Sequence, residues 1–128
     1  MRGKQRFFLC ETCKNLVSLI EDQSVPLVCC GSKMAELVAN TEDASREKHV
    51  PVVTVSGNEI HVAVGSVPHP MVEAHHISFV YLKTERGGQR KSLKVGEEPK
   101  VSFCFIDDKP LEVYEYCNLH GLWKTEVV

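Results

Sequence analysis

Four of the six cysteines in this 128-residue chain fall within its first forty residues, as Cys10 and Cys13 in "CETC" and Cys29 and Cys30 in "LVCC". So short a segment cannot bury enough apolar surface to fold unaided, so it needs a metal or a partner chain. The only apolar run near the start is "FFL", too short for a signal-peptide core. We therefore expect a cytoplasmic protein, in which thiols stay reduced and metal binding is favoured over disulfides.

Four thiolates arranged as a tetrahedron suit zinc or a single iron. Zinc ribbons normally use Cys-x-x-Cys twice, whereas this chain has the adjacent pair Cys29 and Cys30. Two neighbouring cysteines cannot both present relaxed sulfurs to one metal, which favours a tuned redox centre over a structural one. Two disulfides, or a vicinal disulfide between residues 29 and 30, are the alternative.

The overall composition is that of an ordinary globular protein, with 43% hydrophobic and 25% charged residues. A net charge of −2 argues against a nucleic-acid partner. No segment approaches the roughly 20 apolar residues that cross a bilayer, so we expect no membrane association.

Two domains are expected, residues 1–38 and 39–128, joined by a polar linker over residues 39–48 that has room for a short helical turn. After the linker, apolar and polar residues alternate in short runs separated by turn signals. These runs are "PVVTVSG", "NEIHVAVGS", "HISFVYLKTE", "KSLKVG", "KVSFCFIDD" and "LEVYEYC". The pattern predicts an all-β chain whose second domain is an immunoglobulin-like antiparallel β-sandwich.

Histidines and one cysteine form a second group of candidate ligands. His49 lies in "EKHVP" before the first expected strand, and His69 lies between two prolines that restrict its backbone. His75 lies at a strand entry, and Cys117 and His120 share the stretch "YCNLHG". Imidazoles with one thiolate suit iron, zinc or copper. The set predicts a metal site, with His49 as a fifth ligand.

Other candidates have simpler interpretations. His61 lies inside a predicted strand and is expected to be an ordinary histidine. His75 and His76 point to opposite faces of a strand, so at most one binds the same metal. Cys104, in "SFCFI", is expected to be a buried apolar residue. Trp123 is expected to serve in packing.

Taken together, these stretches resemble the desulfoferrodoxin form of superoxide reductase over essentially the whole chain. The matching stretches are "CETC", "LVCCG", "EKHVP", "GSVPHPM", "HHI" and "YCNLHGLWK". They occur in the order and at the spacing of that family. Several long stretches that match at once are a specific signal, whereas "CETC" alone is a weak one.

The resemblance implies two iron sites per chain. The first is a desulforedoxin-like centre in the first domain, with ligands Cys10, Cys13, Cys29 and Cys30. The second is the active iron, whose ligands are four roughly coplanar histidines and an axial thiolate, with the sixth position open. These ligands are His49, His69, His75, His120 and Cys117.

The resemblance also implies a reaction, one-electron reduction of superoxide to hydrogen peroxide. Lys48 would lie near the open position and attract the anionic substrate, and Glu47 would ligate the ferric iron. Electrons would come from an external donor such as rubredoxin, and two chains would pair through the small domain as a homodimer. The alternatives are a zinc-binding module and a non-catalytic iron electron carrier.

Two positions depart from the family pattern. Lys14 follows Cys13 where many relatives have glycine, at a turn that calls for a positive φ. His76 adds a second histidine beside His75. Neither departure removes an expected ligand.

Overall fold

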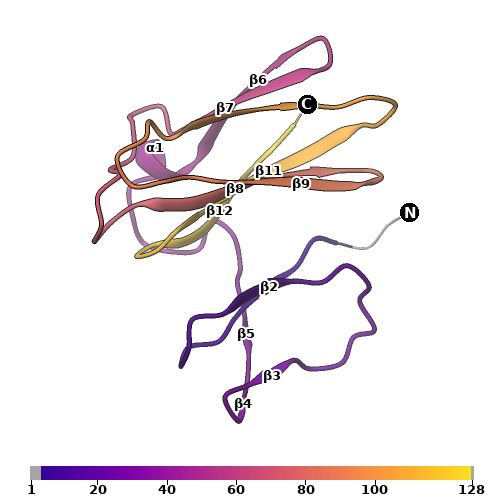
Figure 1. The fold of residues 1–128 in the computed structure, drawn as a ribbon, viewed down its shortest axis with the longest axis vertical. Helices are drawn as coiled ribbons and strands as arrows, with labels where there is room; N and C mark the ends of the chain where they lie inside the picture. The colour runs from indigo at the N-terminus through magenta and orange to yellow at the C-terminus, as the bar shows by residue number, and fades with distance from the viewer. Residues whose placement is uncertain (1–3, 128) are drawn as a thin grey trace. The chain divides into compact units, whose positions relative to one another are not determined.

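The structure, a computed structural model, describes residues 4–127 and is almost entirely β (Figure 1). Contacts divide the chain into two compact units, Met1–Val38 and Ala39–Val128. None of the helices among the described residues has the length and apolar character needed to cross a membrane.

The smaller unit consists of short strands. They are β1 (Phe7–Leu9), β2 (Leu16–Ser18), β3 (Val28–Cys29), β4 (Ser32–Lys33) and β5 (Ala35–Glu36). Strand β1 pairs with β2 and β5 in an antiparallel sheet, and β3 and β4 form a hairpin. Among the described residues, its buried hydrophobic cluster consists of Phe8, Cys10 and Met34, with a few partly buried residues packed against it. Such a small core agrees with the expectation that this unit needs further stabilisation.

Arg6 strengthens the small sheet with charged hydrogen bonds. Its Nε and Nη2 donate to the two carboxylate oxygens of Glu36 on β5 at 3.0 and 2.9 Å. Its Nη1 donates to Asp22 at 2.8 Å, and its guanidinium lies 5.0 Å from the centre of the Phe8 ring. The bidentate contact ties the start of β1 to β5, and the bond to Asp22 ties it to the β2–β3 loop.

The larger unit contains one short helix and seven strands among its described residues. They are α1 (Arg46–His49), β6 (Pro51–Ser56), β7 (Glu59–Val64), β8 (Ile77–Thr84), β9 (Gly87–Ser92), β10 (Lys100–Cys104), β11 (Pro110–Cys117) and β12 (Gly121–Glu126). The strands form two antiparallel sheets, with the orders β10-β7-β6 and β12-β11-β8-β9. The predicted all-β fold with an antiparallel second domain is confirmed, apart from one helical turn at the end of the expected linker.

One hydrophobic core joins the two sheets. It takes residues from β7, β8, β10 and β11, and these are Ile60, Val62, Val64, Ile77, Val80, Leu82, Phe103, Val113 and Cys117. Successive residues of a strand point to opposite faces of its sheet. Because Phe103 pairs with Ile60 on the inner face, Cys104 turns outwards opposite Glu59 and is exposed. The expectation that Cys104 is buried was therefore wrong.

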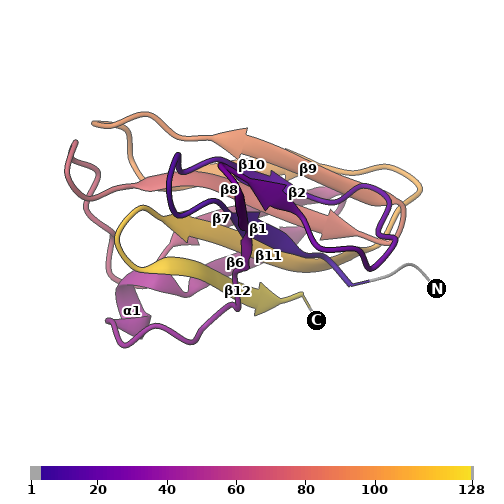
Figure 2. The same ribbon diagram turned by 90° about the horizontal axis from the view of Figure 1, so that it is seen from below.

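Three connecting segments gather at one end of the larger unit. Both views place α1 at the same end as the β7–β8 loop and the β11–β12 turn (Figures 1 and 2). This follows from the antiparallel pairing, because β6 starts, β7 ends and β11 ends at that edge. Four of the candidate ligands, His49, His69, His75 and His120, lie on these three segments.

Glu115 is an exception inside the sandwich, because it is fully buried on β11 two residues before Cys117. Neither of its carboxylate oxygens has a hydrogen-bond partner among residues 4–127. Burial raises the pKa of Glu115 well above its ordinary value. Desolvation therefore favours the neutral form of this carboxyl group in the folded chain.

We expect Glu115→Gln to change how stability depends on pH. Above the ordinary pKa of about 4.3 the unfolded chain releases the Glu115 proton, whereas the folded chain keeps it, so stability falls as pH rises. The glutamine side chain of the variant has no ionisable proton in this pH range. Urea unfolding should show its advantage over the wild type growing by about 1.4 kcal/mol per pH unit from about pH 5 towards the raised folded pKa. A difference independent of pH would mean that Glu115 is ionised in the fold.

Candidate metal centres

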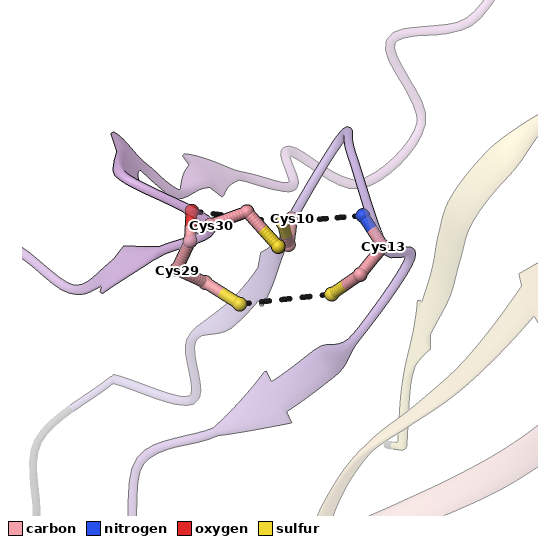
Figure 3. Close-up of side chains that lie close together, drawn as sticks. All are labelled: Cys10, Cys13, Cys29 and Cys30. Atoms are coloured by element: carbon pink, nitrogen blue, oxygen red, sulfur yellow. Dashed lines mark hydrogen bonds between the residues drawn. The ribbon is translucent and has the colours of Figure 1, made fainter.

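The first centre brings together Cys10, Cys13, Cys29 and Cys30, whose sulfur atoms all lie within 4.8 Å of one another (Figure 3). Two come from the turn after β1, and two come from the end of β3 and its turn into β4. The Sγ atoms of Cys13 and Cys29 are 3.6 Å apart, well beyond the roughly 2.05 Å of a disulfide. All four are free thiols.

The turn between the first two cysteines favours a thiolate. The backbone N–H of Cys13 lies 3.4 Å from Cys10 Sγ and lowers the pKa of Cys10 to about 6. Hydrogen bonding with the Cys13 thiol raises the pKa of Cys29, and it raises that of Cys30 to about 12. The thiolate form is therefore most favoured at Cys10, whose charge adds to the raised pKa values of Cys29 and Cys30. A cation among them allows all four to become thiolates.

Two residues of this centre have left-handed backbones. Lys14 has a φ of 68°, at the position where a positive φ was expected from its place after Cys13. Cys30 has a φ of 53°, which turns its side chain away from the strand direction of Cys29. Left-handed geometry costs a non-glycine residue about 1–2 kcal/mol. The backbone at Cys30 is therefore strained where it brings two adjacent cysteines into one centre.

The second centre contains a closed ring of four imidazoles, in the order His49, His69, His75 and His120. Neighbouring ring centres are 4.7, 4.6, 5.1 and 4.9 Å apart around this circuit, and their planes cross at 75°, 79°, 76° and 87°. Ligand atoms of the first three and of Cys117 lie within 4.8 Å of one another. His120 Nδ1 is 3.2 Å from His49 Nε2 and 3.9 Å from Cys117 Sγ.

Hydrogen bonds fix which nitrogen of two histidines carries the proton. His49 Nδ1 lies 2.6 Å from the carbonyl of Ser45, and His69 Nδ1 lies 2.7 Å from the carbonyl of Pro70. A carbonyl only accepts, so each Nδ1 carries the hydrogen and each Nε2 has a bare lone pair in the neutral ring. These two Nε2 atoms nevertheless face each other at 3.1 Å.

A cation accounts for this arrangement of acceptors. His75 Nε2 is also buried with no hydrogen-bond partner among the described residues. A metal in the middle of the ring would satisfy all of these lone pairs, and the backbone carbonyls would orient its ligands. The donor set, imidazoles with one cysteine, fits iron, zinc or copper.

Burial favours the neutral form of three imidazoles, those of His49, His69 and His75. It lowers the pKa of His69 to about 4 and is the main cause of the lowered pKa values of His49 and His75. Burial also raises the pKa of Cys117, opposed by the backbone N–H groups of Leu119 and His120. Without a cation Cys117 is therefore a neutral thiol, and a bound metal would reverse this preference.

Close backbone packing joins the β7–β8 loop to α1. A Cβ on Gly65 would lie only 2.5 Å from the carbonyl oxygen of Glu47, so the contact requires glycine. The same carbonyl accepts a hydrogen bond from Val67 N–H at 3.0 Å, and His69 N–H donates to the Val64 carbonyl at 2.9 Å. These contacts bring His69 to His49.

Trp123 supports the ring from β12. Its indole stacks on His49 with ring centres 5.0 Å apart and planes 24° apart. Its Nε1–H donates to the carbonyl of His120 at 3.0 Å. Trp123 is fully buried, as expected for packing, but it also contacts two of the four ring residues.

Lys48 and Glu47 are exposed on α1, immediately before His49. The positive charge of Lys48 adds to burial in lowering the pKa of His49 and His75. Lys48 therefore contributes positive potential at two members of the ring while its own side chain is open to solvent.

The remaining candidates lie elsewhere. His61 Nδ1 is 2.7 Å from Ser102 Oγ on the outer face of its sheet, and the His76 ring lies beside the carbonyls of Val72 and Glu73. Gly65 was not predicted from the sequence, although its place in "VGSVPHP" was a signal. The carbonyls of residues 45 and 70 left no signal, because any residue has a carbonyl.

Comparisons with known proteins agree with this geometry. The family model described as Desulfoferrodoxin matches residues 41–126. A desulfoferrodoxin from Syntrophotalea carbinolica is 44% identical over 126 residues, which cover 98% of this chain and 99% of the relative. A desulfoferrodoxin from Nitratidesulfovibrio vulgaris is 40% identical with the same coverage.

Solved structures give the same result. The crystal structure of the superoxide reductase from Treponema pallidum is 40% identical and superposes with a TM-score of 0.81, covering 97% of this chain and all of that one. The superoxide reductase (1Fe-SOR) from Giardia intestinalis is 34% identical, with a TM-score of 0.55 over 63% of this chain and 97% of that one.

We expect Gly65→Ala to loosen the second centre, because its new methyl group would meet backbone atoms that have no room to move aside. Displaced supporting groups typically weaken metal binding about 10- to 100-fold. Cobalt(II) titration should show this loss at the histidine–cysteine centre and unchanged binding at the four-cysteine centre. Ser66→Ala is the control, since it removes only one hydrogen bond to the same Glu47 carbonyl. Equal affinities in both variants would show that the close approach is not needed.

Proposed function

The chain belongs to the desulfoferrodoxin family and is a superoxide reductase, and on this basis we propose which of its residues hold each metal and which carry out the reaction. We assign the reaction to residues 39–128, at His49, His69, His75, His120 and Cys117. The observation that carries this assignment is the closed ring of imidazoles whose bare nitrogens face one another beside a buried thiol. We assign residues 1–38 to a separate, desulforedoxin-like metal domain.

We propose iron as the metal of both centres. Two metal-binding groups are present, and each donor set is one that iron accepts. Iron at the second centre would supply the single electron that, with two protons, converts superoxide to hydrogen peroxide. The chain's own part is to hold neutral imidazoles and an ionisable thiol in place before the metal arrives.

Lys48 is proposed to guide superoxide. The substrate is an anion, and a positive side chain beside the ring raises its local concentration and its rate of encounter. The exposure of the Lys48 side chain suits this reaction, because a solvated ammonium group also exchanges protons with water and the reaction consumes two protons. Glu47, exposed on the same helical turn, is proposed as the carboxylate that ligates the oxidised metal.

The electrons must come from outside the chain, since each turnover consumes one. We propose a small rubredoxin-like protein as the donor and the four-cysteine centre as a store or relay of electrons. Free thiols in both centres fit a reducing compartment, which supports a cytoplasmic location.

A homodimer is proposed to complete the small unit. Its exposed apolar side chains include Ile20, Val25 and Val28, which are 98%, 69% and 68% exposed. Val25 also lines a groove of about 650 Å³, together with Phe8 and Met34 among others. A second copy of the chain would cover this apolar surface and the open edges of the short strands.

We expect Lys48→Ile to slow the reaction with superoxide and to weaken its dependence on ionic strength, because a steering charge is lost. Pulse radiolysis of the iron-loaded protein measures both. Lys109→Ile removes another exposed lysine, next to the start of β11 and so at the far end of that strand from Cys117, and should leave both unchanged. An unaltered rate in the Lys48 variant would remove this residue from the mechanism.

Cys13→Ser should abolish the colour of the first centre while superoxide reduction continues, because the two groups of ligands lie in different units. Optical spectra and metal content give the first result, and pulse radiolysis with a pre-reduced sample gives the second. Loss of both would show that the centres depend on each other.

Val25→Lys should shift the chain from dimer to monomer, because it places a charge on the apolar surface of the small unit. Sedimentation equilibrium measures the mass, and Val55→Lys on the larger unit is the control. A wild-type monomer at tens of micromolar would rule out the proposed pairing.

A further inference from the structure

Asn118 makes three hydrogen bonds to one short stretch of backbone, although its side chain is exposed. Its Nδ2 donates to the carbonyl of Ala74 at 3.0 Å, and its Oδ1 accepts from the N–H of His76 at 2.8 Å. Its own backbone N–H donates to the carbonyl of His76 at 3.2 Å. The carboxamide thus uses a donor and an acceptor on residues 74 and 76.

Residues 74 and 76 flank His75, so these bonds hold the backbone in place on both sides of that histidine. Asn118 itself lies between Cys117 and His120 on the β11–β12 turn. It therefore links the β7–β8 loop, which supplies His69 and His75, to the β11–β12 turn, which follows Cys117 and supplies His120. His75 and His120 are neighbours in the ring, with centres 5.1 Å apart.

His75 is held differently from two other members of the ring. The rings of His49 and His69 are fixed through an Nδ1 bonded to a backbone carbonyl. The backbone of His75 is paired with Val72 through bonds of 3.0 and 3.1 Å, and Asn118 ties the residues on either side of His75 to the β11–β12 turn. Orientation of ligands by surrounding hydrogen bonds strongly affects metal affinity.

We propose that Asn118 is a positioning residue, which sets His75 against Cys117 and His120. The inference rests on the proposed function of this centre but not on its turnover. Asn118 acts through the backbone of residues 74 and 76, and the proposal involves no contact of its side chain with substrate or metal.

The test compares Asn118→Ala with Asn58→Ala, which removes another exposed turn asparagine at the opposite end of β7 from the ring. We expect hydrogen exchange of the His76 amide to speed up at least about 10-fold in metal-free Asn118→Ala, because its acceptor is gone. Asn118→Asp keeps that acceptor and should restore the protection. Amides in the core of β8 should exchange as in the wild type.

The second readout uses cobalt(II) in both centres of the full chain. A chelator should remove it from the histidine–cysteine centre about 10- to 100-fold faster in Asn118→Ala, with a changed thiolate charge-transfer band. The four-cysteine centre in the same sample is the internal control. Unchanged release would overturn the inference, and faster exchange throughout β8 would reduce Asn118 to a general stabiliser. Since neither readout uses superoxide, a chain inactive towards superoxide would leave both results interpretable.

Discussion

The fold around the second centre depends on electrostatics that the protein alone does not satisfy. Neutral imidazoles point bare nitrogens at one another across 3.1 Å, and a further buried nitrogen on His75 has no partner among the described residues. Buried acceptors without donors are strongly unfavourable. Several neighbouring groups hold these ring nitrogens close together. They are the Ser45 and Pro70 carbonyls, the glycine contact with α1 and the indole of Trp123. A cation turns this unfavourable arrangement into the source of local stability.

The sequence was sufficient for the broad architecture, because strand alternation and cysteine spacing are local signals. It was also sufficient to nominate both groups of ligands, since the histidines stand at strand ends where an antiparallel sheet brings loops together. It was misleading at Cys104, where an apolar neighbourhood in sequence concealed an outward-facing strand position. Periodicity identifies two faces of a strand, but only the pairing of Phe103 with Ile60 decides which face is buried.

The supporting contacts were beyond sequence analysis for a physical reason. Carbonyl groups orient His49 and His69, and every residue has one, so no side-chain letter records them. Asn118 was visible in "YCNLHG", yet its partners are backbone atoms forty residues earlier, near His75. Glu115 was likewise unremarkable within "LEVYEYC", and only its complete burial explains why its pKa is raised.

The two centres prepare for a metal in opposite ways, which explains why one chain has two kinds of unit. In the small unit, a backbone N–H stabilises negative charge on Cys10 before any metal binds. In the sandwich, burial suppresses charge on Cys117 and on the imidazoles, and carbonyls select the tautomer. A shallow turn is enough for the first strategy, whereas the second requires a deep core. The larger unit can therefore combine a desolvated ring with an exposed Lys48 one residue away, where an anion can approach.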